Sequence, residues 1–145
     1  MGVEGNKKTV QLIEDAYNRG DLNSLNQYFA EGFDNSQSAP PGFPIGIEPA
    51  KQMHLMSMQA YPDRKTEILQ LIGEGNKVMA FVRVTGTNKG GVPWFEVPAN
   101  NAKMDFNFMS IFEFDDQGMI IKHTGLVDGF TQLVQLGVYT PPSTG

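Results

Sequence analysis

The side chains best suited to acid–base chemistry lie in the C-terminal part of the chain, where His123 is followed closely by Asp128. A carboxylate held among apolar side chains has a raised pKa and can remove a proton next to a carbonyl group. Asp128 fits this role because Leu126 and Phe130 flank it. An aspartate also favours the N-cap of a helix, and residues 129–136 are predicted to form a helical turn. The sequence leaves both roles of Asp128 open.

Four further polar side chains have plausible roles in a binding site. His123 can relay protons near neutral pH, although a lone histidine on a strand often makes one structural hydrogen bond instead. Asp105 and Asn107 share a strand face, which is either a pocket floor or a surface turned to solvent or to a partner. Tyr17 can reach a cavity from the first predicted helix, but a core position with a wet hydroxyl is the favoured interpretation.

Two apolar side chains are candidates for the wall or mouth of a pocket. Trp94, the only tryptophan, lies in a Gly-, Pro- and Asn-rich stretch at 89–101 and belongs either to a pocket lip or to a dimer contact. Met53 lies in a methionine-rich stripe of the third predicted helix, which favours a pliable core face over a dedicated ligand surface. His54, beside this stripe, is predicted to lie at the core boundary.

Two consecutive amphipathic helices are predicted at the start of the chain. The first covers residues 7–19 with Asn6 as its N-cap, and the second, shorter helix is capped by Asp21 and carries Phe29. A loop rich in proline and glycine follows at 33–46. Its length and its apolar residues favour an ordered, lid-like segment, in which a short strand could also lie.

A third helix is predicted from Pro49 to the position before Pro62, because proline fits the first helical turn and disfavours the helical conformation of the residue before it. From residue 65 the pattern changes to alternation, which predicts four strands in an antiparallel meander. On the strand at 104–114, alternation places one mostly apolar row on a single face: Met104, Phe106, Phe108, Ser110, Phe112 and Phe114.

Helices that precede strands predict the α+β class, with three N-terminal helices packed on a curved antiparallel sheet that forms a cone-shaped half-barrel. A chain of 145 residues suits a single domain over 1–145. Three helices of modest length cover only one face of such a sheet. The other face would be an exposed apolar patch on a monomer, so a homodimer formed through sheet faces is predicted.

The composition argues against several classes of protein. The chain has no cysteine and only two histidines, so neither a thiolate site nor an ordinary zinc site is expected, and no cofactor is predicted. A net charge of −5 argues against binding to nucleic acid. The sequence has no apolar run of the roughly 20 residues that cross a membrane, and its start does not resemble a signal peptide. A cytoplasmic protein is expected.

Three stretches are informative together: TVQLIEDAYNRGDLNSLNQYFAEGF, PIGIEPAKQMHLMSMQAYPDRKTEILQLIGEGNKVMAFVRVTGT and MSIFEFDDQGMIIKHTGLVDGFTQLVQLGV. In this order they resemble the SnoaL-like polyketide cyclase (ester cyclase) family of the nuclear-transport-factor-2-like superfamily. The resemblance implies a cone-shaped α+β barrel, usually a homodimer, with a hydrophobic pocket and no metal or cofactor. Characterised members close polyketide rings by intramolecular aldol condensation with an aspartate as acid and base, and Asp128 matches that position. Where relatives commonly carry Glu-His-Trp-Asp, this chain has Lys122-His123-Thr124-Gly125.

The sequence therefore predicts a cofactor-free cyclase, lyase or isomerase. It would act by acid–base catalysis on a lipophilic carbonyl or polyketide-like compound bound in a hydrophobic pocket. The alternative is a non-catalytic protein that binds a small apolar ligand in the same cavity. The expected partners are a small lipophilic molecule and a second copy of the chain.

Overall fold

A computed structural model describes residues 2–143, in which three α-helices and two short 3-10 helices accompany five strands. Because the helices largely precede the strands, the predicted α+β class is confirmed. In chain order the elements are α1 (Val3–Arg19), η1 (Asn23–Gln27), β1 (Phe29–Gln37), α2 (Ile47–Ala60), β2 (Lys65–Glu74), β3 (Lys77–Thr87), η2 (Pro93–Phe95), β4 (Lys103–Phe114), β5 (Ile120–Val127) and α3 (Gly129–Gln135).

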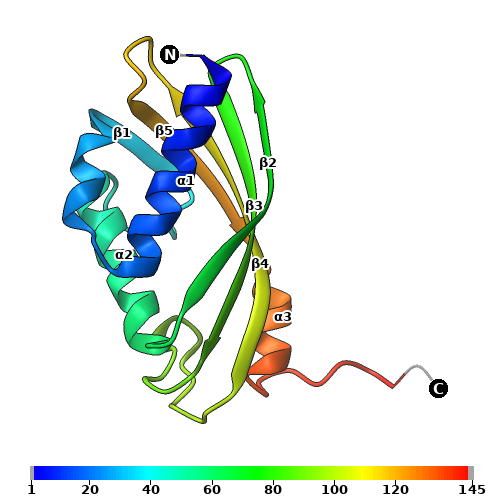
Figure 1. The fold of residues 1–145 in the computed structure, drawn as a ribbon. Helices are drawn as coiled ribbons and strands as arrows, with labels where there is room; N and C mark the ends of the chain where they lie inside the picture. The colour runs from blue at the N-terminus through cyan, green and yellow to red at the C-terminus, as the bar shows by residue number, and fades with distance from the viewer. Residues whose placement is uncertain (1, 144–145) are drawn as a thin grey trace.

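The five strands form one open, curved sheet in the order β1-β5-β4-β3-β2. Figure 1 shows α1 and α2 side by side on one face of this sheet, which we call the inner face. In the same view none of the described helices covers the opposite, outer face of β2 and β3. The short helix α3 follows β5 and lies beside the lower end of β4 (Figure 1). The sheet thus has one covered face and one open face.

Strand β1 is the main difference from the predicted fold. Residues Phe29–Gln37 pair in parallel with β5, so the sheet is mixed and not a four-stranded antiparallel meander. The short strand foreseen within the loop at 33–46 is confirmed, but Phe29 belongs to this strand and not to the second helix. The rings of Phe29 and Phe33 point into the core with their centroids 4.7 Å apart. Burial of these two rings anchors a strand whose other residues are mostly polar.

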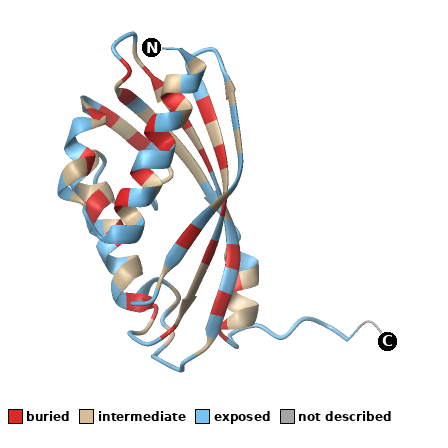
Figure 2. Ribbon diagram, viewed as in Figure 1, coloured by how far each residue is buried: buried red, intermediate tan, exposed pale blue. Residues whose placement is uncertain are grey.

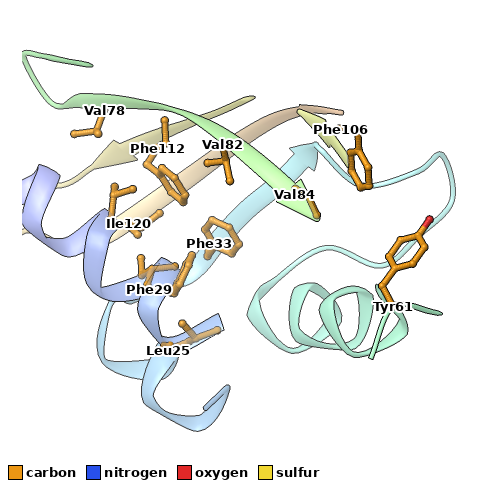
Figure 3. Packing of buried hydrophobic residues seen from close by; sticks show 14 of the residues in the cluster. Leu25, Phe29, Phe33, Tyr61, Val78, Val82, Val84, Phe106, Phe112 and Ile120 are labelled. Carbon is orange, nitrogen blue, oxygen red and sulfur yellow. The ribbon is translucent and has the colours of Figure 1, made fainter. Parts of the chain in front are cut away.

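Strand β4 confirms the predicted alternation. Phe112 and Phe114 are almost fully buried on the inner face, while Asp105 and Asn107 are exposed on the outer face. Figure 2 shows the buried positions concentrated between the sheet and the helices, and Figure 3 shows Phe112 among the side chains of the core. Each fully buried phenylalanine contributes about 1.5–3 kcal/mol to folding.

Helix α1 starts earlier than predicted, at Val3, and Asn6 is therefore not its N-cap. Asn6 is 3% exposed, and its side-chain oxygen is buried without a hydrogen-bond partner among the described residues. The extra turn is held by close packing on the sheet, because a Cβ added at Gly73 of β2 would lie 2.5 Å from Val3 Cγ1. This contact extends the helix past the position that the local sequence favours.

The second helix is shorter than predicted and has 3-10 geometry over Asn23–Gln27. The residue at its N-cap position is Leu22 and not the predicted Asp21, but Asp21 Oδ1 accepts a hydrogen bond from the Ser24 backbone N–H at 3.3 Å. The third predicted helix is confirmed as α2, which ends at Ala60, before Pro62. The backbone N–H of Tyr61 caps this end by donating to the Ser57 carbonyl.

The packing face of α2 differs from the predicted methionine stripe. Met56 is 37% exposed and Met53 is half-buried, whereas Lys51 and His54 are buried. Lys51 Nζ donates to Asn26 Oδ1 at 2.6 Å and forms an ion pair with Glu48, which compensates its burial. His54 is a core residue and not a boundary residue. The buried face of α2 therefore includes two polar side chains, Lys51 and His54, where hydrophobic patterning predicted the methionine stripe.

Candidate functional site

His123 is the polar centre of the inner face. It lies on β5 opposite Phe112 of β4, in the row of side chains that face the helices. Its Nδ1 is 2.9 Å from the Ser38 hydroxyl, and its Nε2 is 2.9 Å from the Ser110 hydroxyl. Ser110 is 3% exposed and interrupts the phenylalanine row of β4. Each ring nitrogen is thus hydrogen-bonded to a serine, one on β4 and one just after the end of β1.

The hydrogen bonds around His123 favour one of its two neutral tautomers. The Ser38 hydroxyl also lies 3.1 Å from the Asn35 backbone carbonyl, which can only accept a hydrogen bond. When Ser38 donates its single hydrogen there, its oxygen accepts from His123 Nδ1–H. Nε2 then accepts from the Ser110 hydroxyl. We assign a continuous series of hydrogen bonds that runs from the Ser110 hydroxyl through the neutral imidazole and the Ser38 hydroxyl to the Asn35 carbonyl.

Burial keeps His123 uncharged. Desolvation lowers the pKa of its imidazole to about 4, because the surrounding groups do not solvate a positive charge. The ring stacks against Phe108 with centroids 6.3 Å apart and lies 4.9 Å from the Phe112 ring. At neutral pH the site therefore presents a neutral imidazole between two hydroxyl groups on an aromatic wall.

Gly125 makes room for this arrangement. A Cβ at position 125 would lie 2.8 Å from Phe108 Cζ, 3.0 Å from His123 Cε1 and 3.1 Å from Ser38 Cβ. Real Cβ atoms almost never approach another side chain that closely, so any larger residue would displace the ring or the serine. The glycine is thus a requirement of the Ser38–His123 contact.

Asp128 is the N-cap of α3. Its Oδ1 accepts a hydrogen bond from the Thr131 backbone N–H at 3.0 Å, and its Oδ2 accepts from the Thr131 hydroxyl at 2.6 Å. These two bonds lower the pKa of Asp128, and its side chain is exposed. The expectation of a buried carboxylate with a raised pKa is therefore wrong for this conformation. The capping interpretation is confirmed, because the helix leaves N–H groups that a carboxylate satisfies.

Aromatic side chains gather near Asp128, where the inner face opens. Trp94 is 42% exposed, and its ring lies 6.3 Å from Phe95 and 6.3 Å from Tyr61. Phe95 in turn approaches Gly129, the first residue of α3. Trp94 thus lies at a rim beside the inner face, and a pocket lip remains a prediction for it.

Asp105 and Asn107 lie on the outer face, away from His123. Asp105 forms a two-point ion pair with Arg83, at 2.9 Å to Nε and 2.6 Å to Nη2. Asn107 is exposed, and its backbone carbonyl accepts a hydrogen bond from the Asp128 N–H. Of the two predicted alternatives for Asp105 and Asn107, the structure shows the exposed strand surface and not a pocket floor.

Tyr17 lies on the inner side, between α1 and α2. Its ring packs on His54 with centroids 4.2 Å apart. Burial raises the pKa of the Tyr17 hydroxyl, and the side chain is half-buried, which fits the core position that the sequence favoured. Met53, one position before His54, is half-buried on the same helix.

The seven predicted site residues are therefore dispersed. His123 and Tyr17 face the inside, Trp94 and Asp128 lie near its opening, and no side-chain hydrogen bond joins any two of the seven in the described structure. Sequence reasoning missed Ser38 and Ser110 as partners of His123. A signal for Ser110 was present, because a serine within a row of phenylalanines on the apolar face calls for a polar neighbour. No local signal marked Ser38.

Two hollows on the surface lie outside this site. One, of about 220 Å³, is on the outer face and is lined by Gln70, Ile72, Met79, Phe81 and Met109. The other, of about 360 Å³, lies between α1 and β2. Residues 2–143 contain no group of three or more His, Cys, Asp or Glu side chains placed to hold a metal ion. In the same residues no helix is long and apolar enough to cross a membrane.

Comparison with known proteins decides the family. The family model described as SnoaL-like polyketide cyclase matches residues 7–136. The chain belongs to the SnoaL-like polyketide cyclase family. No curated protein matches it.

Solved structures share the SnoaL-like fold over almost the whole chain. TsrD from Streptomyces laurentii superposes with a TM-score of 0.84 at 21% identity, covering 96% of this chain and 99% of its own. AclR from Streptomyces galilaeus gives 0.82 at 18% identity, covering 96% and 100%. A SnoaL-like polyketide cyclase from Agrobacterium tumefaciens gives 0.74 at 19% identity, covering 94% and 100%. At these identities the similarity establishes a common fold.

Proposed function

We propose that this chain is a cofactor-free, cyclase-type enzyme that acts by acid–base chemistry on a lipophilic carbonyl compound. The observation that carries the proposal is the neutral His123 held between Ser38 and Ser110 on the aromatic inner face. Membership in the SnoaL-like polyketide cyclase family supports the class of reaction. The substrate would be largely apolar because its binding surface would be formed by phenylalanines.

The proposed reaction begins with removal of a proton next to a carbonyl group. The C–H bond breaks, its electron pair moves to the carbonyl oxygen, and the proton goes to a carboxylate, for which Asp128 is the candidate. The resulting enolate carbon then attacks a second carbonyl of the same molecule, and the proton returns to the new alkoxide. To stabilise the developing oxyanion, Ser38 would turn its hydrogen from the Asn35 carbonyl to that oxygen while its own oxygen still accepts from His123 Nδ1–H.

Asp128 would have to release one of its two bonds to Thr131 to act as this base. A carboxylate that caps a short helix at an exposed position can exchange such bonds with solvent or substrate more readily than a buried one. Its lowered pKa makes it a weaker base, so the oxyanion contacts would supply most of the rate.

The proposal can be tested without the natural substrate. Propiophenone is a lipophilic ketone whose α-hydrogens exchange slowly in D₂O, and NMR follows the exchange directly. We expect the wild-type protein to accelerate this exchange. His123→Asn and Asp128→Asn should each lower the rate at least about tenfold, while Asp116→Asn in the exposed β4–β5 turn should leave it unchanged. Exchange that is equal in all four proteins would overturn the assignment.

A non-catalytic binding protein is the second candidate, and one observation favours it. Both carboxylate oxygens of Asp128 are engaged in the helix cap, and among residues 2–143 the only side chain bound to it is that of Thr131. A protein that only binds would broaden the NMR signals of propiophenone without accelerating the exchange of its α-hydrogens. The same experiment thus separates the two functions.

A second copy of this chain is the proposed partner on the outer face. Two cross-strand rows of apolar side chains lie there, one through Ile72 and Met79 and the other through Phe81, Met109 and Leu126. Leu126 is 71% exposed and Ile72 is 51% exposed. Such a continuous apolar surface is typical of an interface between subunits.

A further inference from the structure

A buried asparagine, Asn35, lies beside the contact between Ser38 and His123. It belongs to β1 and is 3% exposed, and alternation along the strand places its side chain on the same face as Phe33, whose ring Figure 3 shows in the core. An amide in such an apolar row is costly to bury unless its polar atoms are hydrogen-bonded. The bonds that Asn35 makes are therefore informative about its role.

The backbone carbonyl of Asn35 holds the start of the loop that follows β1. It accepts hydrogen bonds from the backbone N–H groups of Ser38 and Ala39, both at 3.0 Å, and lies 3.1 Å from the Ser38 hydroxyl. Ser38 Oγ also lies 3.4 Å from the His123 carbonyl. Both carbonyls can only accept, so the serine directs its hydrogen at a carbonyl and its oxygen is left to accept from His123 Nδ1–H.

The side chain of Asn35 holds the other end of the same loop. Its Oδ1 accepts a hydrogen bond from the Gly46 backbone N–H at 2.8 Å, although 11 positions separate the two residues. Gly46 has a φ angle of 120°, which residues other than glycine rarely adopt, and it is the N-cap position of α2. Asn35 therefore fixes both ends of the loop at 38–46 and ties this loop to β1 and to α2.

The middle of the loop, residues 39–45, is otherwise weakly attached. In the described part of the chain, the one hydrogen bond that joins these residues to another segment is that of Ala39 to Asn35, while the Phe43 N–H donates within the loop. Phe43 is half-buried and Ile45 is 56% exposed, so apolar burial anchors the loop only in part. The closed position of the loop therefore depends on the bonds of Asn35 at its two ends.

We propose that Asn35 is a positioning residue that holds the loop at 38–46 closed and thereby sets which nitrogen of His123 carries the proton. While the loop is closed, Ser38 is held against Nδ1, and Nε2 accepts from Ser110. When the bonds of Asn35 break, Ser38 leaves with the loop, and the imidazole loses the partner that favours one tautomer. The inference rests on the proposed function for the use of His123, because a loop that releases Ser38 also exposes one side of the ring.

Nitrogen NMR of the imidazole tests the proposal without a substrate. The chain has only two histidines, so one variant, His123→Asn, assigns the signals of both. At pH 7 the wild type should show His123 as a single neutral tautomer with Nδ1 protonated. In Asn35→Ala the preference for this tautomer should fall about fivefold or more, as expected for the loss of one hydrogen bond, and the two nitrogen shifts should move toward each other. Unchanged shifts in a folded Asn35→Ala would overturn the proposal.

Asn88→Ala is the matched control. Asn88 is fully buried in the loop before β4, and its side-chain oxygen accepts a hydrogen bond from the Gly91 backbone N–H at 3.0 Å, so it holds its own loop as Asn35 does. Each substitution removes such a bond and lowers global stability, but only Asn35→Ala should change the signals of His123. A merely structural role for Asn35 predicts that the two variants affect His123 alike, and that result would contradict the assignment.

Amide hydrogen exchange on the wild type covers the case in which Asn35→Ala does not fold. The N–H groups of Ala39 and Gly46 should exchange at least about tenfold more slowly than free amides and with equal protection within about threefold, because one opening of the loop exposes both. The Ile45 N–H, which donates no hydrogen bond among the described residues, is the unprotected reference. Exchange of Gly46 at the rate of Ile45, or unequal protection of Gly46 and Ala39, would overturn the proposal. If propiophenone exchange fails while these effects are seen, the proposed function falls and the role of Asn35 in holding His123 stands.

Discussion

Ser38 Oγ and His123 Nδ1 lie 2.9 Å apart, although 85 positions separate the two residues along the chain. The contact exists because β1 pairs in parallel with β5 at the edge of the sheet and its end carries Ser38 over the inner face. Ser38 and Ser110 hold the imidazole from two sides. The parallel pairing of β1 with β5, which the sequence did not predict, thus brings Ser38 to His123 beside the phenylalanines of β4.

Removing the Ser38 hydroxyl should destabilise the protein. In Ser38→Ala the Nδ1–H of the half-buried His123 loses its acceptor, which costs about 0.5–1.5 kcal/mol in the free energy of unfolding. Urea unfolding at pH 7 measures the effect. Ser36→Ala, at an exposed position of the same strand, serves as the control. Equal stability of Ser38→Ala and wild type would show that this contact does not order the ring.

Enlarging Gly125 should displace His123. In Gly125→Ala the new methyl group would contact Phe108, His123 and Ser38 at 2.8–3.1 Å, and overpacking of this kind costs about 1–3 kcal/mol. Gly2→Ala is the matched control, because a Cβ there meets nothing within 4 Å and the φ angle of −89° suits alanine. Thermal unfolding compares the two. A neutral Gly125→Ala would contradict the tight packing around the ring.

Acid should destabilise the protein through both histidines. Each pKa is depressed in the folded state, to about 4 for His123 and about 3 for His54, while the unfolded chain titrates near 6.5. Between these values the unfolded chain binds more protons, so stability is complete above pH 6.5 and is lost as the pH falls. From pH 6.5 to 5 each histidine should cost up to about 2 kcal/mol.

The histidine contribution is separable from that of the carboxylates. His54→Gln keeps a neutral polar side chain of similar size but cannot titrate, so the slope of its unfolding free energy against pH should be smaller than that of the wild type. Urea unfolding at several pH values between 5 and 7 gives both slopes. Identical slopes would mean that the pKa of His54 is the same in the folded protein as in the unfolded chain.

Asp128 should behave as a helix cap in its effect on stability. Asp128→Ala removes both bonds to Thr131 and should lower the melting temperature, whereas Asp128→Asn keeps one accepting oxygen and should lower it less. Differential scanning calorimetry at pH 7 distinguishes the two variants. An Asn variant more stable than the wild type would restore the interpretation of Asp128 as a strained, functional carboxylate.

The outer face should mediate self-association. Met109→Lys places a charge in the centre of the apolar rows, and sedimentation at micromolar concentration should then show a monomer where the wild type sediments as a dimer. Leu12→Lys changes a partly exposed leucine on α1 and should leave the dimer intact. A monomeric wild type would count directly against the proposed assembly.

Strong local periodicity made most of the fold predictable. The alternation of β4 correctly separated its buried face from its exposed face, and Pro62 correctly marked the end of α2. The parallel pairing of β1 with β5, and the start of β1 at Phe29, escaped prediction because only Phe29 and Phe33 carry its apolar signal and β5 lies far along the chain. Asn6 misled the placement of the first helix, because a contact between Val3 and Gly73 outweighed its capping preference.

The site was harder to predict than the fold, because its contacts are long-range. The sequence identified His123 and both roles of Asp128, but the choice between those roles depended on where Thr131 points. Ser38 could not be found without the pairing of β1 and β5.

The central claim is that His123 is a neutral imidazole fixed between Ser38 and Ser110, and nitrogen NMR titration of its ring tests this most directly. The account predicts that His123 stays in one neutral tautomer, with Nδ1 protonated, from pH 8 down to about pH 5, and that its pKa is about 4. Titration near pH 6.5, or a mixture of both tautomers at pH 7, would show that the ring is solvated and would contradict the claim.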